Sequence, residues 1–171
     1  MASAQVLNGE EQAIFDELIS ATLGKADVNS EPIIRLVTLG FIKNYHKDKL
    51  ALQIIDQHDW SGEPAKPYPQ VIPAQVDPVE FRHLGPVPQG SKAGVVYADG
   101  TDSTARKWLV AFDGQAKKVY VEAGPIGPVD WNVIEVKLDA SEDVSKYQDP
   151  ILGGKAAATF KGYRVAVLFS N

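Results

Sequence analysis

After residue 40 the chain consists largely of short apolar runs, rich in β-branched and aromatic residues, which polar turn residues separate at close spacing. Such short runs bounded by turn residues predict strands. Asp99-Gly100 and Asp113-Gly114 separate three of the runs, and Asp-Gly favours turns because it tolerates a positive φ. Gly162 separates the last two. The best strand candidates are 93–97, 108–112, 118–121, 156–160 and 163–169.

The N-terminal pattern has the helical period instead. Asn8 can cap a helix, and Glu11 lies three residues later, where its side chain can complete a capping box. Gly24 is a natural stop. The apolar stripe comprises Ile14, Phe15, Leu18, Ile19 and Thr22, and the acidic side carries Glu10, Asp16 and Glu17. This pattern predicts a helix packed on the rest of the protein. A membrane-surface helix is disfavoured because such helices prefer lysine and arginine on the polar face.

Two segments leave helix and strand open. The run 33–39 follows Ser30-Glu31-Pro32, which permits a short helix, but its β-branched residues equally permit a strand. Asp130 can cap a short helix over 131–138, whereas the alternation of Ile134, Val136 and Leu138 permits a strand.

The segment between residues 41 and 90 combines a predicted hairpin with proline-rich loops. The runs 41–44 and 50–55 flank a charged turn and predict a hairpin. Prolines are then expected to interrupt regular pairing, except for a short strand at 81–83. The prolines of the first loop are Pro64, Pro67, Pro69, Pro73 and Pro78.

These elements predict a mainly β protein, a single-domain antiparallel β-sandwich with an N-terminal helix and one or two short helices. No internal repeat or linker divides the chain, so 1–171 is expected to form one domain. In this interpretation 1–40 is mostly helical and packs on a sandwich formed by 41–171.

Composition and charge narrow the function. The chain has 171 residues, 44% of them hydrophobic, and a net charge of -5 without charge blocks. A nucleic-acid partner is not expected, because it would require a basic face. The absence of cysteine excludes disulfides and thiol chemistry. Without a signal-peptide pattern or an apolar run long enough to span a membrane, a cytoplasmic protein is expected. No cofactor is expected.

The stretch Asp56-Gln57-His58-Asp59-Trp60-Ser61-Gly62 carries the most concentrated chemistry. In a strand, Asp56 and His58 share one face and Asp59 points to the other. Two ligands on one face bind a metal only with a third, for which His83 or Asp77 are the candidates. A hydrogen-bonded loop anchor is the favoured interpretation, and no metal site is assigned.

Serine-based catalysis is not expected. Ser61 and Ser91 both neighbour glycine, but neither lies in a G-x-S-x-G elbow, and the chain has no phosphate-binding P-loop pattern. No catalytic residues are therefore assigned, and the protein is predicted not to be an enzyme.

The aromatic residues fall into two groups. Trp108 and Phe112 share parity with Val110, which predicts a buried stripe. Trp60 and Tyr68 flank the start of the proline loop, where aromatic rings can stack on a sugar or enter a lipid headgroup layer. Packing under the loop is favoured for this pair, and ligand contact is kept as the alternative.

An ordered set of motifs resembles the family of the plant 23 kDa jasmonate-induced protein. The motifs are His58-Asp59-Trp60-Ser61-Gly62, Pro67-Tyr68-Pro69 with Ile72, Phe81-Arg82-His83, Gly90-Ser91-Lys92-Ala93-Gly94-Val95-Val96-Tyr97, Trp108-Leu109-Val110-Ala111-Phe112 and Val129-Asp130-Trp131-Asn132-Val133-Ile134. The resemblance implies a stress- or defence-associated protein without catalytic residues. A more distant likeness to actinoporin-like sandwich proteins uses Ile42-Lys43-Asn44, Tyr68-Pro69, Gly94-Val95-Val96-Tyr97 and the strand 108–112.

We therefore expect a non-enzymatic protein that binds a carbohydrate, a small molecule or another protein through its loops. An actinoporin-like lipid- or membrane-binding protein is the first alternative, and a metal-dependent hydrolase is the second. Self-association is left open because exposed sheet edges can pair. The candidate ligand-binding residues are His58, Asp59, Trp60, Tyr68, His83 and Trp131.

Overall fold

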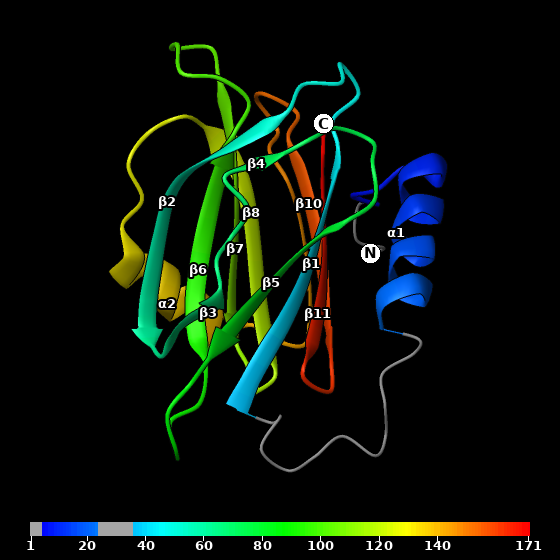
Figure 1. Ribbon diagram of the computed structural model, residues 1–171. Helices are drawn as coiled ribbons and strands as arrows, with labels where there is room; N and C mark the ends of the chain where they lie inside the picture. Colours follow the sequence, from blue (N-terminus) through cyan, green and yellow to red (C-terminus); the bar gives the residue numbers. More distant parts are fainter. Residues whose placement is uncertain (1–4, 24–35) are drawn as a thin grey trace.

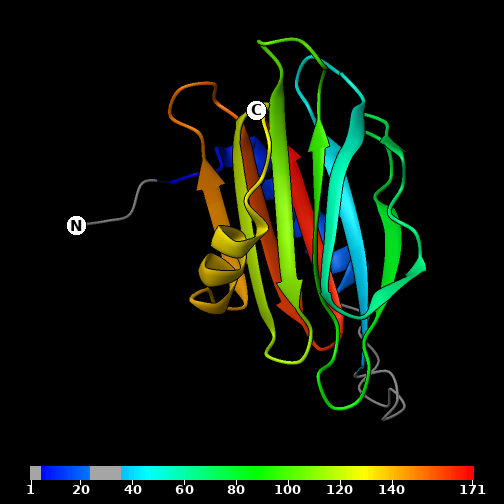
Figure 2. The ribbon, with the colours of Figure 1, turned by 90° about the vertical axis from the view of Figure 1, so that its left-hand side faces the viewer.

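The computed structural model describes residues 5–23 and 36–171, which form two packed β-sheets with a helix on the outer side of each (Figures 1 and 2). The helices are α1 (Gly9–Thr22) and α2 (Trp131–Asp139). The strands are β1 (Val37–Tyr45), β2 (Leu52–Ser61), β3 (Glu63–Lys66), β4 (Val71–Ile72), β5 (Val79–Leu84), β6 (Lys92–Ala98), β7 (Arg106–Asp113), β8 (Lys118–Pro125), β9 (Val144–Gln148), β10 (Lys155–Lys161) and β11 (Arg164–Ser170).

The sheets contain six and five strands. The strand order is β3-β5-β1-β11-β10-β9 in one sheet and β4-β2-β6-β7-β8 in the other. Paired strands run antiparallel, apart from β1 and β11, which lie parallel. The mainly β sandwich with an N-terminal helix, predicted from the sequence, is confirmed.

Alternate residues of the strands fill the space between the sheets. Trp108, Val110 and Phe112 of β7 are fully buried there, which confirms the predicted stripe. They pack with Phe81 of β5 and Phe169 of β11, two strands of the facing sheet. Burial of these large side chains supplies the main driving force for joining the sheets.

The two helices cover opposite sides of the sandwich (Figure 1). The backbone N–H of Glu11 donates to Asn8 Oδ1 at 2.8 Å, and the Glu11 carboxylate accepts from the Asn8 N–H at 2.9 Å, which confirms the capping box. Phe15 and Leu18 of α1 join a cluster with Ala166 and Leu168 of β11. Gly24, the expected helix stop, lies outside the described residues.

The alternatives for α2 are resolved in favour of a helix. The Asp130 side chain accepts hydrogen bonds from the backbone N–H groups of Asn132 and Val133, as an N-cap does. Ile134 and Leu138 then face Val96, Leu109 and Ala111 on the outer side of the five-stranded sheet. Neither helix in the described ranges is long and apolar enough to cross a membrane.

The predicted hairpin of 41–44 with 50–55 is wrong. β1 lies in the six-stranded sheet and β2 in the five-stranded sheet, so the turn between them carries the chain from one sheet to the other. The Asn44 side chain fixes this crossing by donating to the carbonyls of Leu50 and Ile72, both at 2.9 Å. Alternation reports which face is buried, and it does not report which strand is the partner.

The start of the sandwich and three short strands also differ from the prediction. The sandwich begins at Val37 rather than at residue 41, so the described part of the run 33–39 is largely strand, and 33–35 lie outside the described residues. The proline loop contains the short edge strands β3 and β4, and Pro64 is tolerated because an edge strand needs fewer donors. The polar strand β9 has no apolar stripe and was not predicted.

Candidate functional site

The C-terminal half of β2 carries acidic and aromatic side chains, distributed over both of its faces. Asp56 and His58 contact Trp131 of α2 on the outer face, whereas Asp59 contacts His83 of the facing sheet. The parity predicted from the sequence is thus confirmed. The structure therefore separates the six candidate residues into an outer group, an inner group and a residue of the core.

The outer group is a cluster of three aromatic rings. The His58 ring stacks on Trp131 with centroids 5.4 Å apart, and Trp60 meets both rings edge-on, at 5.2 Å from His58 and 5.7 Å from Trp131. All three side chains are half-buried. Trp131 Nε1 also donates to Asp56 Oδ2 at 3.0 Å. We call His58, Trp60 and Trp131 the aromatic cluster.

The local sequence explains how Trp131 reaches β2. The Asp130 cap places Trp131 at the first residue of α2, beside the sheet. Gly94 of β6 lies opposite His58, and a Cβ at Gly94 would stand 2.5 Å from Trp131 Cζ3. The missing side chain is therefore what lets the indole lie against the sheet.

Charged groups border the aromatic cluster. Lys92 Nζ donates to Glu135 at 2.8 Å and to Asp139 at 2.9 Å, and it lies 5.9 Å from the centre of the Trp60 ring. Burial lowers the pKa of Lys92, but the bonds to the two carboxylates outweigh it, and the net pKa lies above its ordinary value. The cluster thus has acids and a fixed cation within reach of its edge.

The inner group joins the two sheets through His83. Asp59 Oδ1 lies 2.7 Å from His83 Nε2, and Ser91 Oγ lies 2.7 Å from His83 Nδ1. His83 belongs to β5 in the six-stranded sheet, whereas Asp59 belongs to β2 in the other sheet and Ser91 immediately precedes β6 of that sheet. The group therefore acts as a polar bridge between the sheets, as the anchor interpretation predicts.

The bridge contains the residue types of a catalytic triad, but its serine is not accessible to a substrate. The Ser91 residue is 1% exposed, whereas the Asp59 side chain is 39% exposed. A nucleophilic serine must face the substrate, and here the carboxylate occupies the outer end instead. The arrangement suits structural bonding rather than acyl transfer.

We expect His83→Gln to lower the free energy of unfolding by about 1–3 kcal/mol, because a buried partner of Asp59 or Ser91 is lost. Burial lowers the pKa of His83 from its ordinary 6.5, and Asp59 opposes this only in part. The unfolded chain therefore binds the proton first, so stability is complete above that value and declines as the pH falls below it.

Thermal unfolding between about pH 7.5 and about pH 5 checks this pH dependence. The decline should be weaker in His83→Gln than in the wild type. His58→Gln is the matched control. It removes the imidazole on the outer face of β2, away from the bridge, and leaves the bridge intact. An equal loss of thermal stability toward acidic pH in the wild type and His83→Gln would contradict the role given to His83.

Tyr68 does not lie with Trp60, contrary to its assignment as a ligand contact. Its side chain is 3% exposed and packs on Phe81 with ring centroids 4.8 Å apart, inside the core. Burial, followed by the nearby Asp59, raises the pKa of its hydroxyl above the ordinary value. Tyr68 is a core residue, as the packing interpretation predicts.

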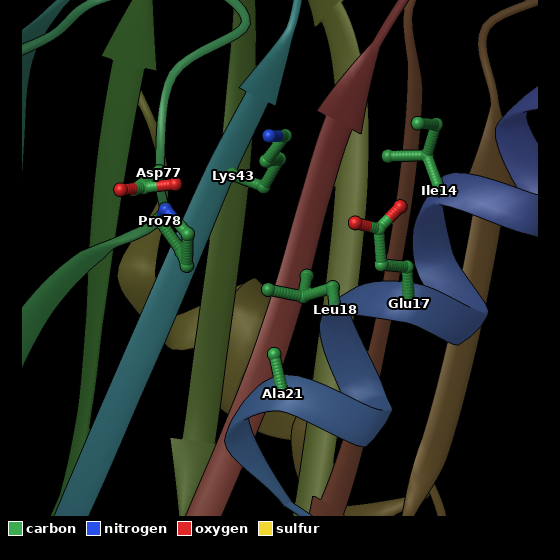
Figure 3. A pocket seen from close by; sticks show the side chains of 7 residues that line it. All are labelled: Ile14, Glu17, Leu18, Ala21, Lys43, Asp77 and Pro78. Carbon is green, nitrogen blue, oxygen red and sulfur yellow. The ribbon is translucent and has the colours of Figure 1, made fainter.

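The suggested metal ligands do not converge. His83 faces away from Asp56 and His58, and Asp77 lines a separate small hollow of about 110 Å³ beside α1 (Figure 3). Over residues 5–23 and 36–171 no three side chains of the metal-binding types come together.

A charged network at the loop end of the sandwich was not recognised from the sequence. The Asp99 carboxylate accepts from Arg106 Nε and from His46 Nε2, each at 3.0 Å, beside an open hollow of about 340 Å³. Burial would raise the pKa of Asp99, but the hydrogen bonds from the Arg106 backbone N–H, the His46 ring and the Arg106 side chain hold it below its ordinary value. The sequence indicates the turn near His46 and the Asp99-Gly100 turn separately, but no local pattern shows that they meet.

Comparisons with known proteins identify the fold. No protein-family model matches the sequence, and no curated protein does. The lipid-binding protein Nakanori superposes with a TM-score of 0.59 at 14% identity, over 95% of this chain and 80% of that one. The Xerocomus chrysenteron lectin XCL superposes with a TM-score of 0.50 at 11% identity, over 78% of this chain and 98% of that one. This chain therefore shares its overall fold with a lipid-binding protein and a lectin.

Proposed function

We propose that this protein is a non-enzymatic, lectin-like protein that binds a carbohydrate at the aromatic cluster. The observation that supports the proposal is the convergence of His58, Trp60 and Trp131 on the outer face of β2, with all three rings half-buried. Rings that only filled a core would be enclosed, as Trp108 is. These rings keep part of their surface available to a ligand.

The surroundings of the cluster suit a sugar. An aromatic ring offers an apolar surface to the C–H face of a pyranose, while the sugar hydroxyls need polar partners. Asp56, Glu135 and Asp139 supply acceptors, and Lys92 supplies a donor. The similarity in fold to a lectin supports the proposal, although at 11% identity it does not transfer a sugar specificity.

We expect Trp60→Ala to weaken carbohydrate binding about tenfold or more, because the ring contributes both contact area and a flat face on which the sugar can stack. A glycan array identifies the sugar, and isothermal titration calorimetry then measures its affinity for both proteins. Tyr163→Ala is the matched control, since it removes a half-buried aromatic ring from the turn between β10 and β11, away from the aromatic cluster. Unchanged affinity in a folded Trp60→Ala protein would remove the cluster from the binding site.

A second candidate function is binding to the lipid of a membrane. The observation that favours it is the similarity to Nakanori, a lipid-binding protein whose fold matches 95% of this chain. Co-sedimentation with neutral and sphingomyelin-containing vesicles tests it directly. Absence of binding to both would exclude this candidate and leave the carbohydrate proposal untouched.

We also propose a stress- or defence-associated role. It is supported by the ordered motifs that resemble the jasmonate-induced family, from His58-Asp59-Trp60 to Val129-Asp130-Trp131. A cytoplasmic location is also proposed. Accumulation of the protein after jasmonate treatment, compared with untreated tissue, would test this role separately from ligand binding.

A further inference from the structure

A row of basic residues crosses the outer face of the six-stranded sheet. Lys66 of β3 lies opposite Arg82 of β5, and Arg82 lies opposite Leu39 of β1. Leu39 also lies opposite Arg164 of β11, which in turn lies opposite Lys161 of β10. Directly opposed residues project from the same face of a sheet. We call the four basic residues of this series, Lys66, Arg82, Arg164 and Lys161, the cationic row; with Leu39 in its middle the row spans roughly 19 Å at the usual strand spacing.

This concentration of cations is unusual in a chain whose net charge is -5. Glu80 lies 3.5 Å from Lys66 and 3.6 Å from Arg82. In the part of the chain that the structure describes, Arg164 and Lys161 form no ion pair with a carboxylate. Like charges on neighbouring strands destabilise a sheet, so an anion bound beside Arg164 would be favoured.

An apolar hollow of about 430 Å³ lies within the row. Its walls include both arginines, Arg82 and Arg164, and its apolar lining includes Val37, Leu39 and Leu84. Leu84 is 44% exposed, so part of this apolar surface faces solvent. The hollow thus combines an apolar surface with two guanidinium groups.

Arg164 is held in place before any ligand arrives. Its Nη1 donates to the Thr22 carbonyl at 3.0 Å, and its Nη2 donates to the Tyr163 hydroxyl at 3.3 Å. The guanidinium also lies over the Tyr163 ring, 5.3 Å from its centre. A fixed guanidinium loses little freedom on binding and matches the geometry of a carboxylate.

We propose that this hollow binds a small anionic amphiphile, a molecule with one carboxylate and an apolar chain. The carboxylate lies between Arg82 and Arg164, and the chain covers Val37, Leu39 and Leu84. The volume is within the usual range for small-molecule sites. The site lies on the sheet opposite the aromatic cluster, so it does not depend on carbohydrate binding there.

Isothermal titration calorimetry with decanoate, below its micelle concentration, tests the proposal on the full chain. We expect saturable binding of one decanoate per chain, and at least about tenfold weaker binding to Arg82→Gln, because a charge-assisted hydrogen bond is lost. Decanol, which lacks the charge, should bind similarly weakly to the wild type. Leu84→Ser should also weaken binding, since it removes exposed apolar surface from the lining.

Two control variants separate this site from others. Lys43→Gln removes a cation from β1 beside α1, outside the hollow, and should leave decanoate affinity unchanged. Trp60→Ala should do the same, whatever it does to carbohydrate binding. The proposal is overturned by a lack of saturable decanoate binding, by equal affinity for decanol, or by wild-type affinity in Arg82→Gln. Binding confined to anionic vesicles would also overturn it.

Discussion

Trp108→Ala is expected to lower the free energy of unfolding by about 3–5 kcal/mol, the usual cost of removing a large buried ring. Trp108 is fully buried between the sheets, and its Nε1 donates to the carbonyl of Ser170 at 2.9 Å. The His46 ring meets it edge-on at 5.9 Å, and the Arg106 guanidinium lies 5.7 Å from its centre. The substitution therefore leaves a cavity and also breaks a hydrogen bond between the sheets.

Urea unfolding followed by far-UV circular dichroism measures this loss as a lower midpoint at an unchanged m-value. Trp108→Phe is the graded control, because it keeps a ring in the core but leaves the Ser170 carbonyl without its donor, at a cost of about 1–3 kcal/mol. A loss below about 1 kcal/mol for Trp108→Ala would show that the ring does not fill the core.

Local patterns in the sequence predicted most of the elements, because each pattern is produced by the element itself. The continuous apolar run around Trp108 reflects a strand buried on both faces, and the Asn8–Glu11 spacing reflects a helix start. Strand pairing depends on distant residues. The parallel pairing of Leu39 with Arg164, for example, leaves no local trace in either segment. That 1–171 form a single domain stays a prediction.

The candidate site was predicted in part for the same reason. Strand parity correctly separated Asp59 from His58, because parity is a local property of β2. It could not show that Trp131 would stack on His58, since that contact depends on α2 folding back over Gly94. The position of Tyr68 in the proline loop left both packing and ligand contact open, with packing favoured, and the side chain indeed turns inward onto Phe81.

The Glu11 carboxylate makes contacts that the local sequence pattern does not predict. The capping box identifies Glu11 as a helix-start residue, yet its side chain is fully buried and bonds to distant strands. Oε1 accepts from Lys155 Nζ at 2.8 Å, and Oε2 accepts from Ser170 Oγ at 2.7 Å. Lys47 Nζ lies 3.0 Å from Oε2. These contacts attach α1 to the six-stranded sheet.

Glu11→Ala is therefore expected to lower the free energy of unfolding by about 3–5 kcal/mol, as for other buried ion pairs that lose one partner. The side chain of Lys155 is only 13% exposed, so its charge is left in a poorly solvated place. Thermal and urea unfolding measure the loss. Glu11→Gln should lose less than Glu11→Ala, because an amide preserves the shape of the side chain and one acceptor oxygen.

The pH dependence separates the charge of Glu11 from its shape. Burial would raise the pKa of Glu11, but the bonds from Lys155, Ser170, Asn8 and Lys47 outweigh it and lower the pKa from 4.5 to about 2. The ionised carboxylate thus stabilises the native state fully above pH 4.5, and this contribution is lost as the pH falls through about 2. The loss amounts to roughly 3 kcal/mol in the wild type and should be absent from Glu11→Gln.

Glu17→Gln, at an exposed position on the same helix, is the control and should lose stability in acid as the wild type does. If Glu11→Gln and the wild type lost stability equally in acid, folding would not lower the pKa of Glu11, and the charge of its carboxylate would add no net stability to the attachment of α1.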